Sequence, residues 1–113
     1  MKRNEVVIDG CLLRLGALRH TPAGTPAIDL LISHSSVQSE AGSRRQVQCE
    51  LEAVALGEAA LGASRLKRNQ QLRITGFLAR RSLGNRQLVL HVTSAETIGD
   101  RASKIEQESR RTQ

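Results

Sequence analysis

Aromatic residues are almost absent from this chain of 113 residues, which contains one Phe, no Tyr and no Trp. The apolar residues are aliphatic instead, with 15 Leu, 7 Val and 6 Ile. Because aliphatic side chains bury less area than aromatic rings, a small domain of this kind gains stability by associating with a second copy. The length and composition therefore predict one compact domain, favour an oligomer and exclude a fully disordered chain.

Cysteine is scarce as well. Cys11 and Cys49 stand 38 positions apart in alternating apolar segments, which fits neither a disulfide framework nor a CxxC zinc pair. We expect both to be buried, reduced thiols. No run approaches the roughly 18 apolar residues of a membrane span, and the N-terminus lacks the apolar region of a signal peptide. The sequence therefore predicts a soluble, cytoplasmic protein without a membrane partner.

Acidic residues are missing from residues 65–86, a stretch that holds seven basic residues. The net charge of the whole chain is +6, whereas the residues outside this stretch include ten basic and eleven acidic ones. Fourteen of the seventeen basic residues are Arg, whose planar guanidinium suits phosphate contacts. Such a segment is typical of a nucleic-acid interface, although an ordinary basic surface would carry the same charge.

Alternating apolar and polar residues predict five strands, over residues 5–18, 27–36, 46–53, 71–78 and 87–96. Residues 56–68 contain enough Ala and Leu for a short helix. Gly10 and Gly16 predict a bulge or a bend in the first strand. This order of three strands, a helix and two strands predicts a mainly β fold, a five-stranded OB-fold Greek-key barrel over residues 1–99.

The alternation also predicts which side chains face the core. The expected inward residues are Ile28, Leu30, Ile32 and His34, then Val47, Cys49, Leu51 and Ala53, then Leu72, Ile74, Gly76 and Leu78, and finally Leu88, Leu90 and Val92. We place Phe77 in or near the core as well. Residues 40–43 read as a hairpin loop, and residues 80–86 as a basic loop with a turn at Gly84-Asn85. Residues 100–113 are polar and are predicted to form a disordered tail whose deletion leaves folding intact.

OB folds bind nucleic acids across their second and third strands and between the loops that join strands 1–2 and 4–5. The basic residues at these places are Arg19, His20, Arg44, Arg45, Arg80, Arg81 and Arg86. We expect the arginines among them to contact phosphates, whereas Arg73 reads as an ordinary surface residue.

Residues that could catalyse a reaction or bind a metal form no such pattern. The three His are separated by 14 and 57 positions, and the chain has neither an HExxH nor a GxSxG motif. The sequence therefore predicts a protein that is not an enzyme and has no cofactor and no metal site.

Several stretches resemble the PriB family (primosomal replication protein N) of the single-stranded-DNA-binding OB-fold proteins. They are Thr21-Pro-Ala-Gly-Thr-Pro26, Ser36-Val-Gln-Ser-Glu-Ala-Gly42, Arg45-Gln46, Cys49, Ile74-Thr-Gly-Phe77 and Val89-Leu-His91. The resemblance covers about residues 4–99, and the block from His34 to Cys49 is its most specific part.

The resemblance implies a homodimeric bacterial protein without enzymatic activity that helps to restart stalled replication forks. It would bind single-stranded DNA and the primosomal helicase, and help to recruit later loading factors of the primosome. By the same resemblance, Arg19 falls on a basic DNA-contact position and Arg80 on a basic position in the loop between strands 4 and 5. Arg81 and Arg86 each lie one step from a further basic position.

The chain also departs from the family pattern. Ser43 and Gln48 stand where family members have aromatic residues that stack on DNA, and Ser35 stands where an arginine is expected. Gln48 remains a candidate for a hydrogen bond to a base edge. We therefore expect weak DNA binding that depends on phosphate contacts.

Two other functions remain open from the sequence. The missing aromatic residues favour an OB-fold module that docks proteins and has little affinity for nucleic acid. The abundance of Arg is equally suited to an RNA-binding OB protein, and only contacts to the 2′-OH would separate RNA from DNA at a given site.

Overall fold

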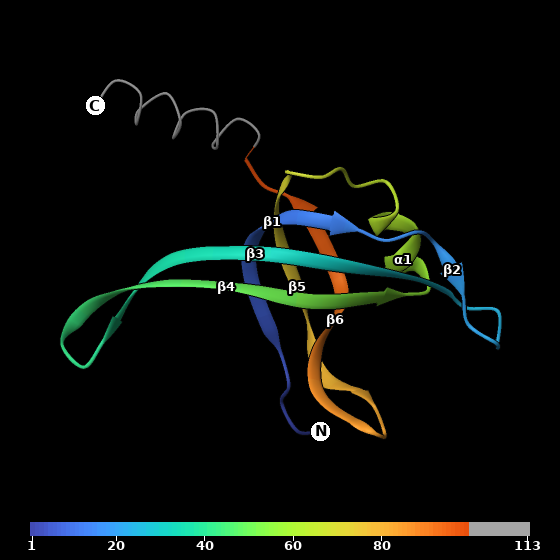
Figure 1. Ribbon diagram of the computed structural model, residues 1–113, viewed down its shortest axis with the longest axis horizontal. Coiled ribbons are helices and arrows are strands. Elements are labelled where there is room, and N and C mark those ends of the chain that lie inside the picture. Colours follow the sequence, from blue (N-terminus) through green and yellow to red (C-terminus); the bar gives the residue numbers. More distant parts are fainter. Residues whose placement is uncertain (100–113) are drawn as a thin grey trace.

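The computed structural model describes residues 1–99, and the predicted tail at 100–113 lies outside them. The described residues form six strands and one helix (Figure 1). In chain order these are β1 (Val6–Leu15), β2 (Arg19–His20), β3 (Pro26–Glu40), β4 (Ser43–Leu56), α1 (Glu58–Ala63), β5 (Gln71–Ser82) and β6 (Asn85–Thr97). None of this part of the chain forms a helix long and apolar enough to cross a membrane.

The strands close into a barrel. The sheet order is β1-β5-β6-β4-β3-β2, and β1 also pairs with β3, which closes the five long strands into a ring. All pairings are antiparallel except a short parallel one between β4 and β6, where Ala53 lies opposite Leu90 and Ala55 opposite Val92. With the two-residue β2 set aside, the five long strands and the helix after the third of them confirm the predicted barrel and its order.

The core of the barrel is aliphatic, as the composition predicts. Its largest fully buried side chains are Leu12, Ile28, Ile32, Leu72, Ile74 and Leu90. Helix α1 adds Ala60 and Ala63 to this cluster. The helix is shorter than predicted, because Gly57 before it has a φ of 67° and the chain leaves the helix at Ser64.

The first strand bends so that it can serve two neighbours. Residues 6–11 pair with β5, and β1 then pairs with β3 from Cys11 onward. A bulge between Leu12 and Arg14 lies in the second part. Gly10 stands at the bend, where a Cβ atom would lie 2.5 Å from Cγ2 of Ile32. The predicted bent strand is therefore confirmed, and close approach of β3 explains this glycine.

Strands β3 and β4 continue past the barrel as a two-stranded arm (Figure 1). They remain paired up to Glu40 and Ser43, and the turn at Ala41 and Gly42 confirms the predicted hairpin loop. The prediction of two buried thiols is wrong, because Cys49 is exposed and Cys11 only partly buried. Cys49 lies on the arm, where its side of the sheet has no barrel wall to cover it.

The hairpin of β5 and β6 also extends past the barrel (Figure 1). The predicted loop at residues 80–86 is wrong, since both strands enter it and only Leu83 and Gly84 form the turn. Leu88 is 57% exposed for the same reason, although we predicted it to face the core. The prediction that Phe77 lies in or near the core is wrong. Phe77 is 39% exposed and stacks on His91 on the outer face, because its neighbours in β5 fill the inward positions.

Candidate nucleic-acid interface

The outer face of β3 and β4 is polar over most of its length. Leu30 and Ile32 on β3 and Ala53 on β4 are buried, so the residues between them point away from the core. This outer face carries Asp29, Leu31, Ser33 and Ser35 on β3, and Gln46, Gln48, Glu50, Glu52 and Val54 on β4. It is the surface that OB folds use for nucleic acids, and arginines reach it from both sides.

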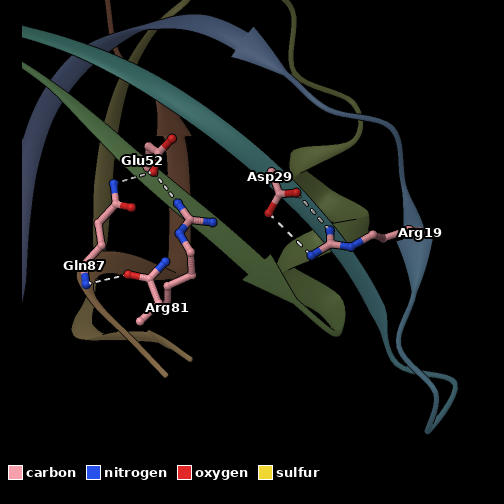
Figure 2. A network of polar contacts seen from close by, with 6 residues as sticks. Arg19, Asp29, Glu52, Arg81 and Gln87 are labelled. Carbon is pink, nitrogen blue, oxygen red and sulfur yellow. Dashed lines mark hydrogen bonds and ion pairs between the residues drawn. The ribbon is translucent and has the colours of Figure 1, made fainter. Parts of the chain in front are cut away.

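Arg19 reaches this face from β2. Its guanidinium lies 3.2 Å from the carboxylate of Asp29, and both side chains are more than half exposed. Strand β2 pairs with the start of β3, where Arg19 lies opposite Ala27. The pairing directs the Arg19 side chain toward Asp29 on β3. The predicted DNA-contact residue Arg19 is therefore held in an ion pair when no DNA is bound (Figure 2).

Arg81 reaches the same face from the β5–β6 hairpin. The register of the hairpin shifts between Arg80 and Ser82, and such a bulge re-aims the side chain at its centre. Arg81 donates to the Oε2 atom of Glu52, and the Gln87 side chain donates to that same atom at 2.9 Å. Figure 2 shows Arg81 and Arg19 approaching the face from opposite sides.

A hollow of about 280 Å³ lies between these two ion pairs. Its lining includes Arg14 and Gly16 from the end of β1 and its turn, together with Asp29, Glu52 and Arg81. Arg14 makes no ion pair with any other residue of the described range 1–99. Sequence reasoning missed Arg14 because the bulge after Leu12 decides which side chains of β1 point outward, and Gly10 and Gly16 predicted a bulge without giving its position.

The predicted pair Arg44 and Arg45 lies elsewhere, at the tip of the arm. Arg19 lies opposite Ala27 and Arg44 opposite Ser39, twelve residues farther along β3. At the rise of a strand this is ~40 Å. Arg44 shares the outer face, whereas Arg45 points to the opposite side and forms an ion pair with Glu40 at 2.8 Å. The structure therefore does not bring all the predicted arginines together.

The remaining predicted residues lie along the hairpin and the arm. Arg80 donates to the carbonyl of Leu83 in the hairpin turn at 3.3 Å. Arg86 follows that turn at the start of β6 and makes no ion pair within residues 1–99. Gln48 lies on the outer face of the arm directly opposite Ser35. Neither side chain can stack on a base as an aromatic ring does.

Arg73 lies away from this face, on the strand pair β1 and β5. It donates to both oxygens of Asp9, at 2.8 and 2.9 Å. These hydrogen bonds hold the pKa of the Asp9 carboxyl below its ordinary value, and the carboxylate raises the pKa of Arg73. The structure thus confirms that Arg73 is a surface residue and gives it a cross-strand partner.

The described residues contain no group of three or more His, Cys, Asp or Glu side chains placed to hold a metal ion. His34 is engaged within the sheet instead, with Nδ1 2.7 Å from the carbonyl of Asp9 and Nε2 2.7 Å from the hydroxyl of Ser36. The arrangement as a whole offers guanidinium groups and polar side chains, a combination suited to binding a polyanion.

Comparison with known proteins agrees with this interpretation. Residues 4–94 match the model of a family described as another single-strand binding protein family. The replication restart protein PriB of Nitrosomonas europaea is 39% identical over 98 residues, which cover 87% of this chain and 91% of that protein. Its namesake from Bordetella pertussis is 38% identical over 95 residues, or 84% and 89% of the two chains.

Solved structures give the same picture. The PriB structure from Ralstonia solanacearum is similar with a TM-score of 0.80 and 32% identity, over 86% of this chain and 99% of that one. The wild-type single-stranded DNA binding protein from Thermus aquaticus is similar with a TM-score of 0.70 and 22% identity. That likeness spans 88% of this chain and 52% of the Thermus protein, and it concerns the fold alone.

Proposed function

This chain belongs to the PriB family of replication restart proteins, and from that premise we propose that it binds single-stranded DNA during the restart of stalled replication forks. It acts as a binding protein in the bacterial cytoplasm and catalyses no reaction. The observation that carries the proposal is the outer face of β3 and β4, where Arg14 and Arg81 line one hollow and Arg19 forms an ion pair with Asp29 of its lining. Guanidinium groups spaced along a sheet face are suited to the repeated phosphates of a nucleic acid strand.

Binding depends on phosphate contacts and not on base stacking. At the centre of the arm, Ser35 lies opposite Gln48, so no aromatic ring stands on this part of the face. Base stacking on aromatic side chains contributes about 1–3 kcal/mol per base in other single-strand binders, and Ser35 and Gln48 cannot supply this contribution. The affinity should therefore fall steeply as salt rises, by a slope of about 0.7 in log–log terms for each phosphate engaged.

The first test is fluorescence anisotropy of labelled poly-dT across a salt series. We expect Arg81→Ala/Arg86→Ala to weaken binding at low salt and to reduce the log–log salt slope by about 1.4, since two phosphate contacts are lost. The matched control is Arg65→Ala/Lys67→Ala, which removes the same charge from the α1–β5 loop and should keep nearly the full slope. Equal slopes for the two variants would contradict a site on the hairpin.

Two further outcomes decide between the other candidate functions. No binding by the wild-type protein even at low salt would favour a module that docks proteins. Stronger binding of poly-U than of poly-dT would favour an RNA-binding protein, because the 2′-OH distinguishes the two strands.

The partners in this proposal are single-stranded DNA, the primosomal helicase, later loading factors of the primosome and a second copy of this chain. Strand edges that stay open among residues 1–99 support the contact with a second copy. Residues 6–10 of β1 pair with β5 along one edge, and the pairing with β3 begins only at Cys11. An open edge is a template for pairing with another chain.

A further inference from the structure

Two carboxylates stand at the centre of the arginine-bearing face. Asp29 lies opposite Val54, and Glu52 lies opposite Leu31 two residues away, so the two acids are diagonal neighbours. Diagonal neighbours on one face of a sheet are about 7–8 Å apart. Each of these acids pairs with one arginine, Asp29 with Arg19 and Glu52 with Arg81 (Figure 2).

We propose that these carboxylates, Glu52 above all, occupy the places where DNA phosphates bind and act as intramolecular competitors that set the affinity of the face. The inference rests on the proposed function, because it concerns the same site. Carboxylates and phosphates both accept hydrogen bonds from the guanidinium fork in the same planar geometry. A phosphate that binds Arg81 must therefore displace Glu52 and leave its negative charge nearby.

Glu52 is the more effective competitor of the two. The side chains of Glu52 and Arg81 are each 39% exposed, whereas those of Asp29 and Arg19 are 60% and 52% exposed. A less exposed pair is less weakened by water and salt. Oε2 of Glu52 also accepts a hydrogen bond from Gln87, and this second donor fixes the carboxylate in place.

The position of Glu52 also links two elements. Strands β4 and β6 pair only over Ala53–Ala55 and Leu90–Val92. Next to the end of this short pairing, Glu52 holds one residue from each strand of the β5–β6 hairpin, Arg81 and Gln87. Removing the carboxylate therefore frees Arg81 for a phosphate without breaking the strand pairing of the barrel.

The test compares Glu52→Gln with Glu50→Gln in poly-dT binding across a salt series. Glu50 lies on the same strand and the same face two residues earlier, and it forms no ion pair within the described range. Both variants lose one negative charge, but only the first releases an arginine. We expect Glu52→Gln to bind about two- to fivefold more tightly than Glu50→Gln, the range set by exposed ion pairs. Its log–log salt slope should match that of Glu50→Gln, because Arg81 contacts the same phosphate in both variants.

Two further variants make the result specific. In an Arg81→Ala background, the gain from Glu52→Gln should shrink to that of Glu50→Gln, because no arginine is left to release. Asp29→Asn should act in the same direction with a smaller effect, and it serves as the test if Glu52→Gln does not fold. Equal affinities of Glu52→Gln and Glu50→Gln, with clear DNA binding by both, would overturn this inference and leave the proposed function standing. A failure of the wild-type protein and every variant to bind at low salt would instead overturn the proposed function.

Discussion

Gly76 shows how much of the barrel depends on one missing side chain. It lies on β5 opposite Val92, next to a shift in register, and its backbone touches the backbone of β6. A Cβ atom there would lie 2.0 Å from the carbonyl oxygen of His91 and 2.9 Å from its carbonyl carbon. These are backbone atoms, which cannot turn aside as the end of a flexible side chain can.

We therefore expect Gly76→Ala to lower the free energy of unfolding by about 3 kcal/mol or more, at the upper end of overpacking effects. Chemical denaturation followed by circular dichroism would measure it. Gly62→Ala is the matched control, because a Cβ atom at that position of α1 meets nothing within 4 Å. That substitution should raise the stability by about 0.5–1 kcal/mol, since Ala is favoured over Gly inside a helix. A mild effect of Gly76→Ala would mean that β5 and β6 can separate at this point.

Between strands, the Asp9–Arg73 pair fastens β1 to β5 and makes the stability depend on pH. The two residues lie directly opposite each other, and the arginine lowers the pKa of Asp9 in the folded protein. A group with a lowered folded-state pKa stabilises the fold above its unfolded-state pKa of about 3.9. That contribution is lost as the pH falls from there through the lower folded-state value.

We expect Asp9→Asn to melt at a lower temperature than the wild-type protein at pH 7, with the gap closing as the pH falls below about 4. Thermal unfolding measured from pH 7 to pH 2.5 would show this. Glu5→Gln is the control, because Glu5 makes no ion pair within residues 1–99. A gap that stays constant down to pH 2.5 would contradict the pairing as its cause.

The order of the strands could be predicted from the sequence because apolar residues alternate with polar ones in the strand segments that surround the core. Leu30, Ile32 and Ala53 were assigned to the core correctly on this basis. The outer ends of both hairpins could not be predicted, because there the backbone pairs without a core behind it. For that reason Cys49 and Leu88 are exposed although their positions in the pattern match the buried residues.

The candidate site also has some residues that local sequence predicts and others that only the strand pairing reveals. A run of basic residues without acids predicts Arg81 as a nucleic-acid contact, and the resemblance to a known family predicts Arg19 as another. The acids that pair with them, Asp29 and Glu52, could be found only from the register between β3 and β4. Arg14 required the bulge in β1. Local pattern thus predicted candidate arginines, whereas long-range pairing decides which charged side chains meet.

Within residues 1–99, part of β1 pairs on one side only, which favours association of two copies. We expect sedimentation equilibrium at micromolar concentration to give a mass about twice the 12.3 kDa of one chain. The physical reason is that a small aliphatic domain gains stability by covering an open edge such as residues 6–10 of β1. A mass of one chain at all concentrations would contradict the homodimer. The double variant Arg81→Ala/Arg86→Ala, which leaves that edge intact, should keep the mass of the wild-type protein.

The double role of β1 has a consequence for the time at which the protein can finish folding. The β3–β4 and β5–β6 hairpins each close over a short turn, whereas Val6 must find Gly76, 70 positions away along the chain. Closing so long a loop comes late, because its entropy is lost before its contacts form. During synthesis at about 5–20 residues per second, Val6 leaves the ribosome about 3.5–14 s before Gly76 does. For those seconds the first strand to be made is an exposed edge in a crowded cell, and it is open to the same strand of a neighbouring nascent chain.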